Sequence, residues 1–517
     1  MADMVSPLAI LGQLADPYLL LVILASAFYG LFIGAVPGLT ALMASALLVP
    51  FIIFMEPLPA IASIITASAM AIFAGDIPGA LLRMPGTPAS AAYTDDAHAL
   101  TRKGKTVMAL GAGLFASAAG GLFSAVILTL AAPSLARIAL SFSSVEYFWL
   151  GVLGLSCATF VAGPSLPKGL ASLFLGLTLA TIGMDPTSGI PRFTFGSSNL
   201  MGGLGLIPVL IGLFAISELM RNANSEFHGH ADTHRMGPIF STIGARLLPH
   251  KVGILRGGLI GTVVGALPGA GSDIAAWISY AIARRGSRVG RKDDDDGAVE
   301  RIMSASAANN ASLGGAYIPA TVFGIPGDAI TAIVISVMFI KGINPGPTLF
   351  LNNPDVIYTI FAIFFIANLL MVPLGILCIR AFGLILKLPT SYVSPVILLF
   401  CILGAFSVEN TLFAVGLVAL FGVLGYLMEI NEIPLAPAIL GLILGPLIEQ
   451  TFMTTMLKSQ SDLLIFFERP IGGTIGAFTI LVWLAAIGIK SFSGHRQVEL
   501  TPPPADTAAV PENHRTN

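Results

Sequence analysis

Charged residues are scarce in this chain of 517 residues. Asp, Glu, Lys and Arg together make up 10% of it, whereas soluble domains carry about a quarter. Hydrophobic residues make up 55%, the mean hydropathy is +0.87, and apolar runs long enough to cross a bilayer recur along almost the whole length. The sequence therefore predicts an all-α polytopic membrane protein, and its net charge of −2 gives no indication of a nucleic-acid partner.

Cysteine and recognisable catalytic motifs are also lacking. Cys157, Cys378 and Cys401 all lie in apolar runs and are interpreted as small packing residues. The sequence has no HExxH, GxSxG or CxxC pattern and no GxxxxGKS/T loop, so we predict neither an enzyme nor a nucleotide-driven pump. The histidines of HGHADTH (228–234) have no cysteine or patterned acid beside them, and we predict no metal site there.

The apolar runs and the residues that interrupt them indicate about twelve to fourteen membrane crossings. The predicted spans are 17–36, 39–55, 58–76, 106–131, 145–163, 167–184, 203–220, 252–269, 271–283, 355–378, 390–408, 411–428, 433–452 and 473–490. Residues 77–92 and 303–340 are apolar but rich in Gly, Pro and Asn, which indicates broken or re-entrant segments. The opening residues lack the cationic stretch of a signal peptide, so the first span is expected to be retained.

Polar segments suggest how the chain is organised. We expect a first transmembrane repeat over 1–220, a polar cytoplasmic connection over 221–251, a second transmembrane repeat over 252–492, and a disordered C-terminal tail over 493–517.

Two pairs of motifs indicate the internal repeat. GLFIGAVPG (30–38) aligns with GTVVGALPG (261–269) at an offset of 231, and IPGALLRMPGTPASA (77–91) aligns with IPATVFGIPGDAITA (318–332) at an offset of 241. Each motif carries a Pro-Gly pair inside an apolar segment, where it must interrupt the helix. The sequence therefore predicts four chain breaks that are equivalent in pairs.

Charge in the connecting loops predicts that the repeats are inverted. In the first half the loop between the motifs (52–60) has no Lys or Arg, and the loop after them carries Arg102, Lys103 and Lys105. In the second half the loop between the motifs (284–301) is strongly basic, and the loop after them holds only Lys341. Because cationic loops stay in the cytoplasm, equivalent loops should face opposite sides of the membrane, with the N-terminus outside.

Inverted repeats with broken helices are typical of secondary transporters. The half-helix that follows each break offers unpaired N–H groups and the positive end of its dipole, which suit an anion, and the carbonyls before the break suit a cation such as Na⁺. The alternative is that the Pro-Gly pairs only kink the helices for packing, as membrane helices allow. Four breaks in two symmetric pairs favour the transport hypothesis.

Longer motifs resemble a known family. RGGLIGTVVGALPGAGSDIAAWISY (256–280), AANNASLGGAYIPATVFGIPGDAITA (307–332) and GINPGPTLF (342–350) are its most specific pieces, and DPTSGIPRFTFGSSNL (185–200) and PLAPAILGLILGPLIEQ (434–450) add to them. From about residue 17 to about 490 the chain resembles the large membrane subunit of the tripartite tricarboxylate transporters, the TctA family.

The resemblance implies an importer of a di- or tricarboxylate such as citrate in the bacterial inner membrane. It implies two partners, a periplasmic solute-binding protein and a small four-helix membrane subunit, in addition to the membrane lipid. It also implies symport with Na⁺ or a proton, and elevator-like alternating access. The alternative function is a stand-alone carboxylate transporter or channel that needs no binding protein.

We predict that the substrate carboxylates are bound by residues at the breaks and by two neighbouring amides. These residues are Pro37, Gly38, Leu39, Thr40, Arg83, Thr87, Gly269, Ala270, Gly271, Ser272, Asn309 and Asn310. The coupling ion is predicted at the second pair of breaks, with no other cofactor. Its candidate ligands are Gly86, Ser90, Gly327, Asp328 and Thr331.

Each assignment has a structural alternative. Hydroxyl and carboxyl groups after the breaks could cap the following helices, and the two amides could form hydrogen bonds between helices. Arg83 could reach the membrane interface or pair with Asp76, while Asp76 and Asp273 are further acids near the breaks.

Overall fold

The computed structural model describes residues 7–37, 39–161, 165–185, 187–222, 249–269, 271–286, 295–385 and 390–493. Helices dominate these residues, which confirms the predicted all-α membrane fold, and one short ribbon pairs β1 (Gly183–Met184) antiparallel with β2 (Pro191–Arg192). The helices up to residue 222 are α1 (Pro7–Leu14), α2 (Pro17–Ala35), α3 (Ala41–Ile52), α4 (Pro57–Ala74), α5 (Asp76–Leu82), α6 (Ala91–Arg102), α7 (Thr106–Ala139), α8 (Ser144–Val161), α9 (Leu166–Ala180), η2 (Ser198–Leu200), α10 (Leu206–Leu210), the π-helical turn η3 (Ile211–Ile216) and α11 (Ser217–Asn222).

The described elements after residue 222 again include two helices that are followed by breaks. These elements are α13 (Lys251–Gly265), α14 (Gly271–Gly286), α15 (Asp295–Phe323), α16 (Ala329–Ile340), α17 (Leu349–Asn352), α18 (Pro354–Ile385), α19 (Thr390–Glu409), α20 (Leu412–Ile430), α21 (Leu435–Lys458), α22 (Ile465–Glu468) and α23 (Pro470–Ser493). Most of the connection expected over 221–251 and the tail after Ser493 lie outside the described residues, as do the three histidines of HGHADTH.

Most of each predicted span is helical, but the span 167–184 ends in β1 and the span 203–220 covers α10, η3 and α11. Some helices are longer than predicted. α7 runs on to Ala139 through Pro133, and α18 runs on to Ile385 through Pro373. Proline is tolerated inside membrane helices because neighbouring groups can satisfy the freed carbonyl. Among the described residues, six helices are long and apolar enough to cross a membrane, and five shorter apolar helices accompany them.

Four breaks interrupt the helices where the Pro-Gly motifs predict them. α2 ends at Ala35 and α3 begins at Ala41, while α13 ends at Gly265 and α14 begins at Gly271. The second pair of breaks separates α5 from α6 and α15 from α16. α3 and α16 have 12 residues each, too few to cross a bilayer alone.

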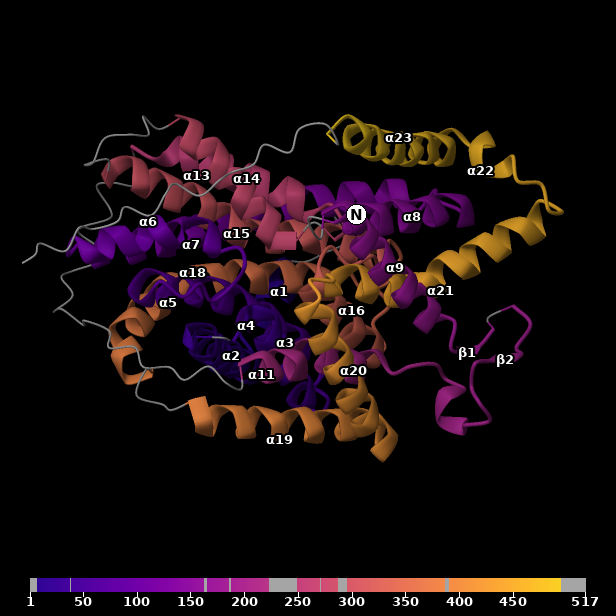
Figure 1. Ribbon diagram of the computed structural model, residues 1–517, viewed down its shortest axis with the longest axis horizontal. Helices are drawn as coiled ribbons and strands as arrows, with labels where there is room; N and C mark the ends of the chain where they lie inside the picture. Colours follow the sequence, from indigo (N-terminus) through magenta and orange to yellow (C-terminus); the bar gives the residue numbers. More distant parts are fainter. Residues whose placement is uncertain are drawn as a thin grey trace, which may run out of the picture.

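The central helices pack in a palindromic order. α13, α15, α7, α18, α4 and α2 lie side by side in that sequence. Figure 1 shows α15 and α18 in the middle of the molecule, α19 along one edge, and α13 and α23 along the opposite edge. Since α2 corresponds to α13 and α4 to α15 in the motif alignment, the order reads the same from either end.

Glycines at equivalent positions bring the helices of each half into backbone contact. A Cβ on Gly30 or Gly34 of α2 would collide with the backbone of Ala67 or Ala71 on α4. In the second half, a Cβ on Gly261 or Gly265 of α13 would collide with Ala308 or Ser312 on α15. The glycines differ by 231 residues and their partners by 241, the two offsets of the motif alignment. Both halves therefore use the same close helix contact, as small residues allow in membranes.

The loops after the motifs contact the other half of the chain. The Lys341 ammonium donates to the carbonyl oxygens of Ile53 at 2.6 Å and Met55 at 2.5 Å, in the loop between the first-half motifs. At the other end, Lys103 and Lys105 donate to Asp295, with 2.8 Å between Lys103 Nζ and Asp295 Oδ1. Each loop after the motifs thus meets the loop between the motifs of the opposite half.

A second polar link joins α6 to α15 beside these lysines. Arg301 binds Asp96 through two hydrogen bonds of 2.7 and 2.9 Å, and the Tyr280 hydroxyl donates to the same carboxylate at 2.9 Å. Nearby, the hydrogen bonds from Lys103 and Lys105 hold the pKa of Asp295 below its ordinary value. The Asp295 ion pairs are therefore retained at neutral pH and are lost only as the pH falls through that lowered value.

The glycine contact predicts the effect of a single methyl group. Gly261→Ala should lower the free energy of unfolding by about 1–3 kcal/mol, because its Cβ overlaps the α15 backbone. Gly416→Ala is the matched control, since a Cβ on this α20 glycine has no neighbour within 4 Å. Thermal unfolding in detergent should show a lower midpoint for the first variant alone, and equal midpoints would contradict the packing described.

Candidate functional site

The breaks open onto one cavity of about 920 Å³. Its wall is formed by the first residues of α3, α14, α16 and α21, by the break between α5 and α6, and by the ends of α11 and α20. Segments more than two hundred residues apart therefore meet at one site. The two breaks of the second half are joined directly, because the Gly269 N–H donates to the Gly327 carbonyl at 2.7 Å.

Most of the predicted site residues reach this cavity. Those that line it are Thr40, Arg83, Gly86, Thr87, Gly269, Gly271, Ser272, Asn309 and Asp328. Other predicted residues do not line it, namely Pro37, Leu39, Ser90, Asn310, Gly327 and Thr331. Gly38 and Ala270 lie outside the described residues.

Glycine is required where the break before α14 turns. Gly269 and Gly271 have φ angles of +81° and +65°, in the left-handed region that glycine adopts without steric cost. A Cβ on Gly269 would also overlap the backbone of Ala158 on α8. Gly86 and Gly327 serve close approach instead, since a Cβ on either would overlap the backbone of Gly75 or Ala316.

Reciprocal hydrogen bonds of hydroxyl and carboxyl groups form just before the helices that follow the second pair of breaks. Before α6, the N–H of Thr87 donates to the Ser90 hydroxyl, and the N–H of Ser90 donates to the Thr87 hydroxyl, both at 3.1 Å. Before α16, the N–H of Asp328 donates to the Thr331 hydroxyl at 2.9 Å, and the N–H of Thr331 donates to Asp328 Oδ1 at 2.8 Å. The two reciprocal pairs of hydrogen bonds are equivalent in the repeat, although only the pair at Asp328 is a capping box, since α6 begins after Ser90. Ser90 and Thr331 are both buried.

α3 begins with a one-sided cap. The Met43 N–H donates to the Thr40 hydroxyl at 3.2 Å, and Thr40 lines the cavity. The capping alternative therefore holds for Thr40 and Asp328, whereas Thr87 closes the turn before α6. Each cap satisfies only part of its helix start, and further N–H groups of the first turn remain for an anion.

The neighbouring amides Asn309 and Asn310 of α15 face different surroundings. Asn309 lines the cavity, and its Nδ2 lies 3.4 Å from the Tyr93 hydroxyl. The Nδ2 of Asn310 donates to the Ser117 carbonyl of α7 at 3.0 Å and to Asn368 Oδ1 of α18 at 2.7 Å. Successive helix residues point about 100° apart, so Asn310 forms the predicted interhelical hydrogen bonds while Asn309 reaches the cavity.

Arg83 lies on the cavity wall but is already paired. Its Nε donates to Asp95 Oδ1 at 2.8 Å, and both side chains are mostly exposed, at 65% and 77%. The alternative of a pair with Asp76 is wrong, because Asp76 instead accepts a hydrogen bond from Tyr93. An exposed ion pair of this kind is weak enough to exchange Asp95 for another carboxylate.

Charged residues outside the predicted set also line the cavity. They are Glu218 and Arg221 of α11, Asp273 of α14, Glu429 of α20, and Glu432. Arg221 pairs with Glu218 at 2.5 Å. Asp273 stands close to a predicted break. For the other four the only sequence signal is a charge at the end of an apolar span, which more often marks the membrane surface.

The donor set of this wall does not form a cluster that suits a transition metal. Among the described residues, no group of three or more His, Cys, Asp or Glu side chains is arranged to hold a metal ion. The wall instead combines helix starts, hydroxyl groups, one amide and carboxylates from several helices. Such groups suit a polar anion and a monovalent cation.

The chain is similar in sequence to a known protein family and to two known proteins. The model of the tripartite tricarboxylate transporter TctA family matches residues 20–440. An uncharacterized 52.8 kDa protein in the TAR-I ttuC' 3' region of Agrobacterium vitis is 30% identical over 447 residues, which are 86% of this chain and 88% of that protein. An uncharacterized protein in the TAR-II ttuC' 3' region of the same organism is 31% identical over 228 residues, 44% of this chain and 94% of that protein. No solved structure matches.

The family match includes every part of the cavity. Its wall runs from Thr40 to Leu440, which falls inside the matched residues, and so do all four breaks and both motif pairs. The predicted resemblance is thereby confirmed over almost the whole helical part of the chain. The chain belongs to the tripartite tricarboxylate transporter TctA family.

Proposed function

We propose that this chain is the large membrane subunit of a secondary transporter that imports a di- or tricarboxylate into the bacterial cell together with Na⁺ or a proton. The observation that carries the proposal is the meeting of the α3, α14 and α16 starts at one cavity. Each start presents N–H groups and the positive end of a helix dipole, so several carboxylates of one substrate can bind at once. At about 920 Å³ the cavity is in the size range of small-molecule sites.

The acidic side chains of the cavity support co-transport with a cation. Asp273, Asp328, Glu218, Glu429 and Glu432 face it, against two arginines that are both paired. An anionic substrate entering alone would be repelled by these carboxylates, whereas one that enters with Na⁺ or a proton would not. Helix starts for the anion and carboxylates for the cation fit a symporter better than a channel.

The contacts between loops support inverted topology. If the halves were parallel, the loops between the motifs would lie on one side, and the loops after the motifs on the other. Lys341 instead binds the first-half loop at Ile53 and Met55, and Lys103 binds Asp295 at the end of the second-half loop. This crossed pairing is expected of inverted halves that exchange access to a shared site, including by an elevator-like movement.

The family supports the partners of the transporter. TctA is the family of a tripartite system, and we infer a small membrane subunit and a periplasmic solute-binding protein that delivers the carboxylate. A stand-alone carboxylate transporter is the alternative, and it differs in partners rather than in the chemistry of the cavity.

Reconstituted transport tests the proposal directly. The chain, with its small subunit, should accumulate labelled citrate or succinate in liposomes when a Na⁺ or proton gradient and the binding protein are present. The same vesicles without a gradient are the control for leakage. Uptake that is unaffected by omission of the binding protein would favour the stand-alone alternative, and no gradient-driven uptake of either compound would contradict the proposal.

The two neighbouring amides provide a matched pair of variants. Asn309→Ala should weaken carboxylate binding about tenfold with little change in the unfolding midpoint, because one hydrogen-bonding group is lost from the cavity. Asn310→Ala should lower the free energy of unfolding by about 1–3 kcal/mol, because Ser117 and Asn368 lose a buried partner. Binding and thermal unfolding measured on both variants should show opposite patterns, and identical patterns would remove Asn309 from the site.

Inverted topology predicts which loops share a membrane side. In a chain without its native cysteines, Arg102→Cys and Arg285→Cys should react with an impermeant maleimide from the same side of the membrane. Glu56→Cys and Asn352→Cys should react from the other side. Labelling of Glu56→Cys and Arg285→Cys from one common side would indicate parallel repeats instead.

A further inference from the structure

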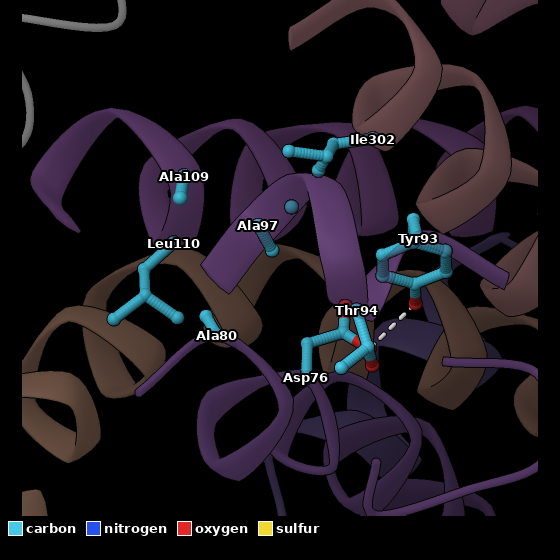
Figure 2. Close-up of a pocket in the computed structure, with 9 residues that line it drawn as sticks. Asp76, Ala80, Tyr93, Thr94, Ala97, Ala109, Leu110 and Ile302 are labelled. Atoms are coloured by element: carbon cyan, nitrogen blue, oxygen red, sulfur yellow. Dashed lines mark hydrogen bonds between the residues drawn. The ribbon is translucent and has the colours of Figure 1, made fainter. Parts of the chain in front are cut away.

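A second, much smaller cavity lies between α5, α6, α7 and α15. Its volume is about 10 Å³, room for one water molecule at most. Figure 2 shows Asp76, Thr94 and Tyr93 together at one side of it, with a hydrogen bond between Asp76 and Tyr93, while Ala80, Ala109 and Leu110 form an apolar side. The structure thus keeps a carboxyl group almost completely away from water.

Asp76 has no cationic partner to compensate its charge. Its carboxyl is in a residue that is 6% exposed, and it accepts hydrogen bonds from the Tyr93 hydroxyl at 2.5 Å and the Ser306 hydroxyl at 3.4 Å. α7 contributes Gly113, where a Cβ would lie 3.5 Å from Asp76 Oδ2. Among the described residues, no Lys, Arg or His forms an ion pair with this carboxyl.

The other titratable groups on the surrounding helices are engaged elsewhere. His98 of α6 bonds through Nδ1 to a backbone carbonyl of α5 at 3.1 Å. Arg83 at the end of α5 pairs with Asp95, and Arg301 of α15 pairs with Asp96. In the part of the chain that the structure describes, α2, α4 and α7 present no acidic or basic side chain to Asp76.

A carboxylate buried without a cation is costly in free energy, so such a group holds a proton readily. Ionisable residues at membrane depth are correspondingly rare and mark ion or proton pathways. A residue needed only for packing would be less costly as Asn or Ser. The position of Asp76 is therefore that of a group that exchanges a proton.

A chain of hydrogen bonds leads from Asp76 to the large cavity. Tyr93 donates to Asp76, and Nδ2 of Asn309 lies 3.4 Å from the Tyr93 oxygen. Asn309 itself lines the large cavity, where the helix starts converge. Only one hydroxyl and one amide thus separate the buried carboxyl from the substrate cavity.

We propose that Asp76 is the proton-binding site of this transporter and that Tyr93 and Asn309 couple it to the carboxylate, an inference that rests on the proposed function. With Asp76 ionised, Tyr93 must donate to it and accept from Asn309 Nδ2, as the structure shows. The amide then presents its carbonyl oxygen to the cavity. A carbonyl oxygen cannot donate to a substrate carboxylate.

Protonation of Asp76 reverses the direction of these hydrogen bonds. The new O–H of Asp76 donates to the Tyr93 oxygen, Tyr93 donates to Asn309 Oδ1, and the amide rotates its NH₂ group toward the cavity. Hydronium that enters from the large cavity gives its proton to Asp76, which forms the new O–H bond, and becomes water. The reverse step returns the proton to water on the other side of the membrane. The neutral carboxyl also repels a substrate anion less, so both effects favour proton and carboxylate binding together.

Linkage makes the coupling reciprocal, because a bound carboxylate must raise the proton affinity of Asp76 by the same factor. Over the pH range in which Asp76 titrates, carboxylate affinity should fall by up to about tenfold per pH unit as the pH rises. Asp76→Asn removes the titrating group and keeps its size. Asp355→Asn is the matched control, an acid at the start of α18 that lines neither cavity.

Infrared difference spectroscopy tests the proton site without any substrate. Acidification of the wild-type protein in lipid should produce a C=O stretching band of a buried protonated carboxyl. Asp76→Asn should lose the part of the band that comes from Asp76, while any contribution of the cavity acids Asp273 and Asp328 remains. The full band should be present in Asp355→Asn, and the Asp76 part should be shifted in Tyr93→Phe, which lacks the hydroxyl bonded to Asp76. A spectrum of Asp76→Asn that equals the wild-type spectrum overturns the proposal.

Transport in Na⁺-free vesicles tests the coupling, with citrate and succinate as probes. The wild type and Asp355→Asn should accumulate the carboxylate on a pH gradient, whereas Asp76→Asn should exchange it across the membrane but lose accumulation. The carboxylate affinity of Tyr93→Phe should depend less on pH than that of the wild type. The two proteins are compared at the same pH values, so that ionisation of citrate or succinate affects both equally.

These outcomes separate the two proposals. Accumulation by Asp76→Asn on a pH gradient, or an unchanged pH dependence in Tyr93→Phe, overturns the role given to Asp76 or to its link. Wild-type uptake that requires Na⁺ and ignores the pH gradient also overturns the coupling while leaving carboxylate transport intact. A wild-type protein that shows the carboxyl band but moves neither probe contradicts the proposed function and leaves the proton site standing. If Asp76→Asn does not fold, the proposal is tested with Tyr93→Phe alone, by the position of its carboxyl band and by the pH dependence of its carboxylate affinity.

Discussion

Every peptide group at membrane depth needs a hydrogen-bond partner, and the four chain breaks create groups that their own helices cannot satisfy. The structure meets this constraint with backbone and side-chain partners drawn from other segments. The Gly269 N–H bonds to the Gly327 carbonyl, and the Gly86 N–H bonds to the Gly75 carbonyl. The reciprocal cap at Asp328 satisfies part of the start of α16, and Thr87 and Ser90 exchange hydrogen bonds in the turn before α6. Because these partners lie on different segments, satisfying the breaks also draws them together around one cavity.

The glycine contacts make that arrangement possible. α2 can lie on α4, and α13 on α15, only where no side chain separates the backbones. The close approach places α15 between α13 and α7, and Asn309 then faces the cavity while Asn310 binds α7 and α18. Two identical side chains thus acquire different roles because one helix is buried on both sides.

The cavity combines opposite electrostatic requirements. Helix starts attract an anion, yet most of the ionisable side chains on the wall are acids. The acids belong to several elements of the wall, since Asp273 and Asp328 lie at the starts of α14 and α16, and Glu218 and Glu429 lie on α11 and α20. A substrate anion and a cation can therefore be accommodated by different parts of one wall. The buried carboxyl of Asp76 lies outside this wall and is linked to it only through Tyr93 and Asn309.

The sequence by itself determined the class of fold, the positions of the breaks and the repeat. These features depend on local patterns, namely apolar runs of membrane length, Pro-Gly pairs that interrupt them, and matching motifs at nearly constant offset. Most residues predicted for the site lie at the breaks, and many of them reach the cavity for that reason.

Only the tertiary structure decided which side chains share the cavity. Glu218, Glu429 and Glu432 reach it from helix ends that no local pattern connects with the breaks. The hydroxyl groups of Ser90 and Thr331 accept hydrogen bonds from the N–H groups three residues earlier in the chain. Arg83 pairs with Asp95 rather than with Asp76. The direction of a side chain depends on which helices pack against its own, and contacts between segments hundreds of residues apart set that packing.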